Sequence, residues 1–343
     1  MRKLECDKQT IEAQIDTIVN RSFEMNHNWD WPAGVAFYGV CLANKATGND
    51  TYITLLKDWI DAFIDFGIPP MSVNSCSMGH SLLTLYHITK DEKYLNIAVE
   101  KADYLVGEAP KFAEGVLQHT VAGKGSVFPE QAWVDTLFMA GYFLIRIGHD
   151  LNNETYTKVG LEQFEGHEKY LQDASTNLYY HGWDNINQNN MSGVFWARGN
   201  AWAAYTMAAA LRNIDVQDAS FMTINGSLRD LVSALLQLQS DDGLWHTILT
   251  DPTSYQETSA SAGIAASLTL TGLHTPRTFQ AAQKALDGLL KKIDQQGTVL
   301  DVSTGTAVMN NIEGYKMTSK KRIEGWGQGL MLVFLSHVLL TNK

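Results

Sequence analysis

A single aspartate inside a long apolar stretch is the first residue of this sequence with an evident use in chemistry. Asp135 is the one charge between Glu130 and Arg146, within FPEQAWVDTLFMAGYFLIR (128–146). A carboxylate in such surroundings must be hydrogen-bonded, paired or used in a reaction. Burial raises a carboxyl pKa, as suits a general acid, whereas a helix that starts near Pro129 favours the ionised form. The sequence leaves open the sign of that shift, and it also leaves open a purely helix-capping role.

A second group of residues combines cations with aromatic rings, which suits a site for an anionic sugar. His181 lies in YYHGWD, and Arg198 and Trp202 lie in MSGVFWARGNAW. Arg198 falls at an expected helix start, where backbone N–H groups favour anions, and its guanidinium binds carboxylate in a fork. Trp133, two residues before Asp135, is a candidate platform for a sugar ring. For each residue alone, a structural role is as compatible with the sequence as a binding role. Arg198 would then pair with an acidic neighbour, and the tryptophans would fill the core.

The elements that must position these residues are helices. Fully apolar segments alternate with amphipathic ones, and the polar turns TGNDTY, TKDEKY and NNETY carry helix N-cap residues. Successive apolar helices start roughly 45–65 residues apart, a period typical of stacked helical hairpins. Twelve helices are predicted, at 9–25, 33–45, 50–65, 77–88, 91–106, 131–147, 153–172, 198–212, 222–240, 257–271, 276–293 and 326–341.

The last predicted helix favours a closed arrangement over an open one. An open solenoid ends in polar capping repeats, but GWGQGLMLVFLSHVLL is as apolar as any other segment. We therefore expect an all-α fold, an (α/α)6 barrel of six helical hairpins that forms a single catalytic domain over residues 1–343. The site is expected at one mouth of the barrel, where four long connections gather: 107–130, 173–197, 241–256 and 294–325.

Composition narrows the partners and the compartment. The chain carries a net charge of −11 and no cluster of Lys and Arg, so neither nucleic acid nor a membrane surface is an expected partner. No signal-peptide core and no apolar run of about 20 residues is found, so a cytoplasmic protein is expected. The three cysteines form no CxxC pair, and phosphate-loop, dinucleotide and zinc motifs are missing. We expect no cofactor and no metal, and the sequence leaves the oligomeric state open.

Several of these segments together resemble a known family. QAWVDTLFM, GWD, MSGVFWARGNAW, SYQETS and GWGQG are similar to the signatures of glycoside hydrolase family 105, the unsaturated rhamnogalacturonyl hydrolases, and of the related family 88. The resemblance extends from about Trp29 to Gly329. It implies an (α/α)6 barrel and a metal-free reaction on a small anionic oligosaccharide that ends in a 4,5-unsaturated uronic acid left by a lyase. Unsaturated galacturonyl-rhamnose from rhamnogalacturonan is the favoured substrate.

The resemblance also implies roles for individual residues. Asp135 would donate a proton to C4 of the vinyl ether, water would add at C5, and the resulting hemiketal would open and release the sugar. The residues that match the substrate-binding positions of the family are Trp133, His181, Arg198, Trp202 and, near the first inner helix, Trp31. A second site aspartate of the family is missing here. Asn74 stands near its place, and an amide binds a sugar hydroxyl but takes up no proton.

Two other functions stay open at this point. A sugar epimerase or isomerase on the same barrel would use histidines as acid and base, and the chain has 10 His. A non-catalytic helical scaffold would instead present a long concave surface to partner proteins. Contact between the first and last helices would exclude the scaffold.

Overall fold

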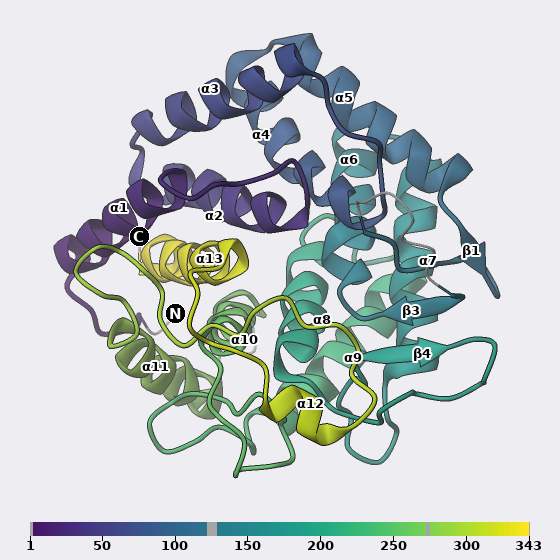
Figure 1. Ribbon diagram of the computed structural model, residues 1–343, viewed down its shortest axis with the longest axis vertical. Coiled ribbons are helices and arrows are strands. Elements are labelled where there is room, and N and C mark those ends of the chain that lie inside the picture. Colours follow the sequence, from purple (N-terminus) through teal and green to yellow (C-terminus); the bar gives the residue numbers. More distant parts are fainter. Residues whose placement is uncertain (1–2, 122–128, 272–274, 343) are drawn as a thin grey trace.

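All twelve predicted helices are found in the computed structural model, which describes residues 3–121, 129–271 and 275–342. They form two concentric rings, as Figure 1 shows. The inner ring consists of α2 (Trp31–Thr47), α4 (Gly79–Thr89), α6 (Tyr142–Leu151), α8 (Ala197–Ala210), α10 (Thr258–Leu270) and α13 (Gly325–Asn342). The outer ring consists of α1 (Lys8–Phe23), α3 (Thr51–Phe66), α5 (Glu92–Asp103), α7 (Glu154–Leu171), α9 (Ala219–Leu235) and α11 (Pro276–Leu290).

The inner ring is closed. Each inner helix packs against the next one in ring order, and α13 returns to pack against α2. The two ends of the chain also meet, because the Leu4 backbone N–H donates to Asn342 Oδ1 at 3.0 Å and α1 packs on α13. The predicted (α/α)6 barrel is therefore confirmed, and the closure excludes the open scaffold.

The division into rings follows the apolar pattern of the sequence. Every residue of α8 and α10 is buried, and so is α13 from Gly325 to Leu339. The outer helix α11 instead buries one face, built around Ala281, Ala285 and Leu289. A helix that is apolar all round belongs in the core, whereas an amphipathic helix covers the core with one stripe.

Glycine allows the two ends of the inner ring to approach each other. A Cβ atom added at Gly39 of α2 would lie 2.5 Å from the Gly329 carbonyl oxygen. One added at Gly329 of α13 would lie 2.3 Å from the Val35 carbonyl oxygen. Both atoms would collide with backbone, so closure of the barrel depends on residues without a side chain at these positions.

The helix predicted over 131–147 starts later than expected. Its first residues form the strand β3 (Gln131–Trp133), which pairs antiparallel with β4 (Gly182–Asp184). A π-helical turn, η3 (Leu137–Gly141), then leads into α6. The partner strand comes from a connection some fifty residues away, so no local pattern indicates the pairing. The short elements not predicted are η1 (Asn74–Met78), η2 (Tyr104–Glu108), β1 (Lys111–Phe112), β2 (Val116–Leu117) and α12 (Ile312–Lys316).

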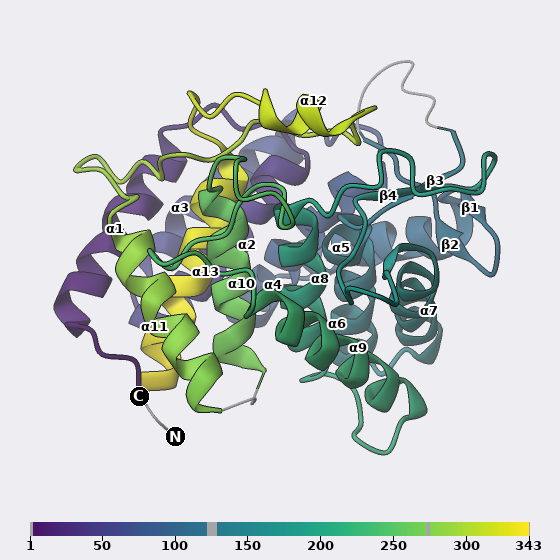
Figure 2. The same ribbon diagram turned by 90° about the horizontal axis from the view of Figure 1, so that it is seen from below.

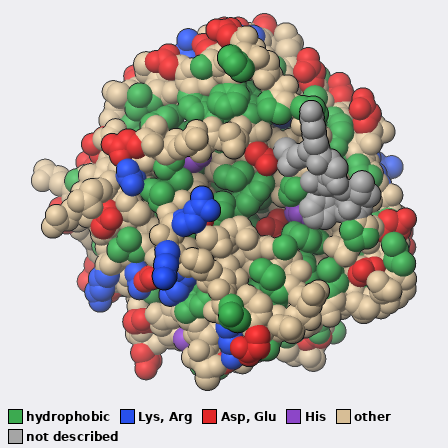
Figure 3. Space-filling view, viewed as in Figure 1, with side chains coloured by type: hydrophobic (Ala, Val, Ile, Leu, Met, Phe, Trp, Pro, Cys, Tyr) green, Lys and Arg blue, Asp and Glu red, His purple; other side chains and the backbone are tan. Residues whose placement is uncertain are grey.

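The long connections gather at one face of the barrel. Figure 2 shows α12, β3 and β4 on this face, with both chain ends on the opposite side. Part of the connection 107–130 lies outside the described residues. In the space-filling view of this face, the centre is hollowed, with His and acidic side chains beside the hollow (Figure 3). Within the described ranges, no helix has the length and apolar character required to cross a bilayer.

Candidate active site

The inner helices deliver their first residues to the mouth of the barrel. Residues from distant segments meet there because all six inner helices point their N-termini to the same face, which also favours anions. The residues at these helix starts are Trp31 (α2), Asn74 (η1, before α4), Asp135 (before η3 and α6), Arg198 (α8), Glu257 (N-cap of α10) and Trp326 (α13).

Asp135 lies in this mouth with its carboxylate free of hydrogen bonds from the described residues. Its backbone carbonyl accepts the amides of Phe138 and Met139, so the residue stands at the start of the helix. The side chain caps nothing: Oδ2 is buried and unpartnered among the described residues. The nearest cation-forming group is His181, whose Nε2 is 3.6 Å from Oδ2. The helix-capping role left open by the sequence therefore finds no support.

The surroundings of Asp135 lower its pKa below the usual value. Burial alone would raise that pKa, but the interactions with His181, His119 and Arg198 together outweigh burial. At 3.6 Å the His181 contact is longer than a hydrogen bond, so we assign its effect to the polar ring nitrogen that faces the carboxylate. The carboxylate is thus ionised in the free protein.

His181 is held in one orientation by a tyrosine that the sequence did not indicate. Its Nδ1 lies 2.8 Å from the hydroxyl of Tyr315, a residue of α12, and its ring packs 4.1 Å from Trp196. Burial lowers the pKa of His181, although Asp135 opposes this shift. A Tyr315 hydroxyl that donates to Nδ1 leaves the proton of the neutral ring on Nε2, which faces Asp135.

Trp133 forms part of the wall beside these groups. Its ring stacks on His119 at 3.8 Å and meets His181 edge-on at 5.5 Å. Its Nε1 donates to Gln131 Oε1 at 3.0 Å. The structure brings Trp133 to the site as predicted, but His119 covers one face of the indole. A sugar-stacking role therefore stays a prediction for the other face.

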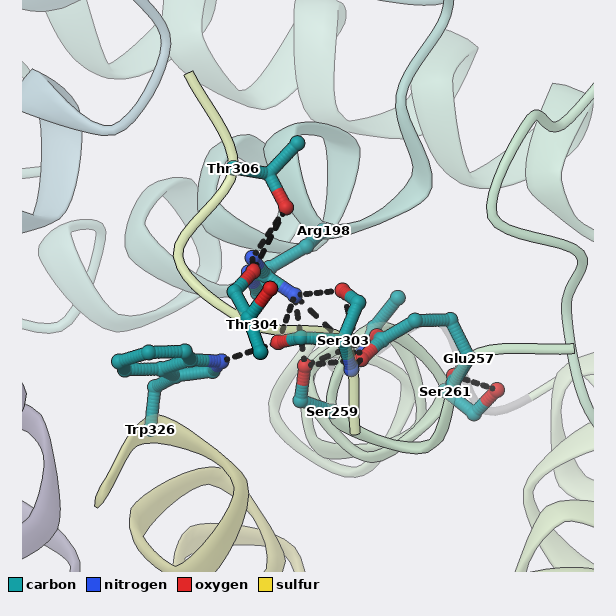
Figure 4. Close-up of polar contacts among 9 residues, drawn as sticks. Arg198, Glu257, Ser259, Ser261, Ser303, Thr304, Thr306 and Trp326 are labelled. Carbon is teal, nitrogen blue, oxygen red and sulfur yellow. Dashed lines mark hydrogen bonds and ion pairs between the residues drawn. The ribbon is translucent and has the colours of Figure 1, made fainter. Parts of the chain in front are cut away.

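Arg198 is fully buried in a network of protein partners, shown in Figure 4. Its Nη1 forms an ion pair with Glu257 Oε1 at 3.3 Å, and its Nη2 donates to the Thr304 carbonyl oxygen at 3.2 Å. Glu257 in turn accepts the backbone N–H groups of Ala260 and Ser303. Arg198 pairs with an acidic neighbour, the alternative that the sequence left open. Its binding of the substrate carboxylate stays a prediction, and its charge acts on Asp135.

The three remaining predicted residues differ in their surroundings. Trp202 is fully buried and packs 5.1 Å from Phe138, and its contact with substrate stays a prediction. Trp31 is partly exposed at the mouth and stacks on Trp326 at 4.5 Å. Asn74 is buried, and its Oδ1 has no hydrogen-bond partner among the described residues. An amide oxygen in that state is available to a ligand hydroxyl.

Five residues of this site were missed at the level of the sequence: His119, Trp196, Glu257, Tyr315 and Trp326. Trp196, Glu257 and Trp326 lie in the segments MSGVFWARGNAW, SYQETS and GWGQG, which carry the family resemblance. His119 and Tyr315 lie in long connections without any periodic signal. Within the ranges that the structure describes, no group of three or more His, Cys, Asp or Glu side chains is arranged to hold a metal ion.

Comparison with known proteins identifies the family and the relatives that this amino-acid sequence resembles. The family model described as Glycosyl Hydrolase Family 88 matches residues 5–341. The unsaturated rhamnogalacturonyl hydrolase YesR of Bacillus subtilis (strain 168) is 54% identical over 344 residues, which cover 100% of this chain and 99% of YesR. An unsaturated 3S-rhamnoglycuronyl hydrolase of Formosa agariphila is 24% identical over 256 residues, 68% of this chain and 63% of that protein.

Solved structures have the same fold. A protein of Salmonella enterica serovar Paratyphi A, described as a possible member of family 105, superposes with a TM-score of 0.93 at 26% identity. The superposition covers 100% of this chain and 97% of that one. The unsaturated glucuronyl hydrolase of Bacillus sp. GL1 superposes with a TM-score of 0.72 at 18% identity, over 95% of each chain, and at that identity it supports the fold alone.

Proposed function

The chain belongs to glycosyl hydrolase family 88, and from this premise we propose that it releases 4,5-unsaturated uronic acid from the non-reducing end of lyase-generated oligosaccharides. Unsaturated galacturonyl-rhamnose from rhamnogalacturonan is the proposed substrate, in line with the 54% identity to YesR. The motif-based resemblance to families 105 and 88 is confirmed by these relatives, and the chain is a glycoside hydrolase. The observation that carries the proposal is the unbonded carboxylate of Asp135, buried at the mouth beside His181.

This geometry supports hydration of a double bond rather than ordinary glycoside cleavage. An ordinary glycosidase uses a pair of carboxylates on the two sides of the scissile bond. Glu257 does not supply the second one, because its oxygens are bonded to Arg198, Ser303 and Ala260. In the proposed reaction Asp135 gives its proton to C4 and water adds at C5. The Asp135 carboxylate then takes up the proton of that water, so the proton balance requires no second acid.

The epimerase alternative has less support. It needs histidines that exchange protons near neutral pH. Burial lowers the pKa of His119 to about 3, and it also lowers the pKa of His181. Both rings are therefore neutral under ordinary conditions and are poor proton donors.

A panel of unsaturated disaccharides tests the proposed function directly. The conjugated double bond absorbs in the ultraviolet, and hydration abolishes this absorbance. We expect the fastest loss with the rhamnogalacturonan disaccharide and slower or no loss with those from ulvan and glycosaminoglycans. A saturated disaccharide is the control. If every unsaturated member keeps its absorbance with the enzyme, the proposal is wrong.

The pH dependence of turnover is expected to differ between free and bound enzyme. Asp135 must be protonated to donate, yet its pKa is lowered in the free protein. A bound uronate brings a second negative charge and raises that pKa. Activity should therefore fall as pH rises through the Asp135 pKa, and the pKa read from kcat should exceed the one read from kcat/KM.

The measurement is a pair of pH profiles on the wild type and on Asp135→Asn. Equal pKa values from kcat and kcat/KM would contradict the effect of the bound anion. A basic limb that persists in Asp135→Asn would assign the titration to another group.

Two further expectations are proposed with this function. One domain over residues 1–343 is supported by the main hydrophobic core, which includes residues from Leu4 to Leu339.

A cytoplasmic location is supported by the three free cysteines, because a reducing compartment keeps thiols unpaired. Subcellular fractionation tests the location, and recovery in an exported fraction would contradict it.

A further inference from the structure

A second cavity lies at the opposite end of the barrel from the mouth, and the proposed function does not use it. Its volume is about 590 Å³, within the range of small-molecule sites. The last turns of the inner helices line it. The polar residues that matter here are Lys45 (α2), His87 (α4), Arg146 and Asp150 (α6), Arg212 (after α8) and His337 (α13).

This cavity gathers positive charge in an acidic chain. None of Lys45, Arg146 and Arg212 forms an ion pair with a residue that the structure describes, and the one lining carboxylate, Asp150, is paired with His87 at 2.7 Å. The whole chain carries a net charge of −11. Three unpaired cations around one cavity create a local potential that attracts anions.

Arg146 is the innermost of these cations and is held by neutral groups. Its Nη1 lies 2.9 Å from His80 Nδ1, and its guanidinium lies 5.7 Å and 5.9 Å from the rings of Tyr38 and Tyr142. His80 Nε2 lies 3.1 Å from the Phe138 carbonyl oxygen, which leaves Nδ1 as the acceptor for Arg146. The guanidinium is thus fixed in place without a direct ion pair to a carboxylate, and the Asp150 carboxylate acts on it only at longer range.

Tyrosine hydroxyls lie beside this guanidinium. The Tyr38 hydroxyl is 2.7 Å from that of Tyr205 and 3.3 Å from that of Tyr142. The Tyr205 hydroxyl in turn lies 3.3 Å from His337 Nε2. Each hydroxyl is able to donate and to accept a hydrogen bond, so this row of tyrosine hydroxyls is able to bind the hydroxyl groups of a ligand.

Helix dipoles explain the positions of only some of the cations at this cavity. The C-termini of the inner helices point to this end, and cations in a last turn offset the dipole. That explains the exposed Lys45 and Arg212. Arg146 lies more than one turn before the end of α6 (Tyr142–Leu151), among tyrosine rings, where the dipole effect has faded.

We propose that this cavity binds a small hydroxylated carboxylate, a sugar acid in chemical class. The planar guanidinium of Arg146 receives the carboxylate, the tyrosine hydroxyls receive the ligand hydroxyls, and Lys45 and Arg212 attract the anion at the rim. The site does not depend on the proposed function, because it shares no residue with the mouth of the barrel.

Titration calorimetry with galacturonate as the probe tests this site. The proteins are the wild type, a rim variant Lys45→Gln/Arg212→Gln, an Arg146→Lys variant, and a control Arg229→Gln/Lys291→Gln. The control removes the same charge from exposed positions outside the cavity. We expect the rim variant and Arg146→Lys to lose about tenfold or more in affinity at one site, and the control to match the wild type.

Two further arms fix the ligand class and the location. Glucose, which lacks the carboxylate, should not bind, and inorganic phosphate should bind more weakly than galacturonate. Turnover of unsaturated substrate by the rim variant should equal that of the wild type, so a failure of the proposed function does not affect this test. Equal galacturonate binding by all four proteins overturns the site, and tighter binding of phosphate overturns the sugar-acid class.

Discussion

Replacement of Asp135 with Asn is expected to lower kcat by about 10²–10⁴-fold or more and to leave KM nearly unchanged. The amide has almost the shape of the carboxylate, and no described residue hydrogen-bonds to the side chain, so the fold has little to lose. The loss falls on proton delivery alone. The residues predicted to hold the substrate at the mouth keep their own partners.

Melting temperature and turnover measured on the same protein separate this role from a structural one. Asp184→Asn is a matched control, because the Asp184 carboxylate accepts the backbone N–H groups of Ile186 and Asn187 at 2.9 Å. It should lower the melting temperature and keep most of the turnover. An Asp135→Asn protein that melts early and turns over normally would remove Asp135 from the mechanism.

Removal of the Glu257 carboxylate is expected to destabilise the protein by about 3–5 kcal/mol, the usual cost of an uncompensated buried charge. Glu257 and Arg198 are both buried, and Nη1 of Arg198 lies 3.3 Å from Oε1 of Glu257. Glu257→Ala leaves the guanidinium without its anion and also leaves the amide of Ser303 without its acceptor. The free energy of unfolding, measured with denaturant, reports the loss.

A double-mutant cycle identifies the ion pair as the cause. Arg198→Ala/Glu257→Ala should cost less than the sum of the single variants, because the second change removes the charge that the first one exposed. A loss below about 1 kcal/mol in Glu257→Ala would contradict the buried pair. Arg198→Ala is also expected to weaken substrate binding by roughly 1.5–3 kcal/mol, measured on folded protein.

The sequence by itself determined the barrel. Segments apolar all round became inner helices and amphipathic segments became outer ones, because burial follows the spacing of apolar residues along a helix. The apolar last helix indicated closure, and α13 does pack on α2. The buried position of Asp135 was also accessible, since it is the one charge in a long apolar segment, and only the family resemblance implied that Asp135 and His181 share a site.

Only the tertiary structure decided what these side chains do. The sign of the Asp135 pKa shift depends on His181, His119 and Arg198, and no rule of local sequence sums their effects against burial. Arg198 meets Glu257 across 59 positions, and His181 meets Tyr315 across 134. Contacts over such separations arise from the closure of the ring. A pattern that repeats every few residues carries information about helix faces and none about which distant side chains share a site.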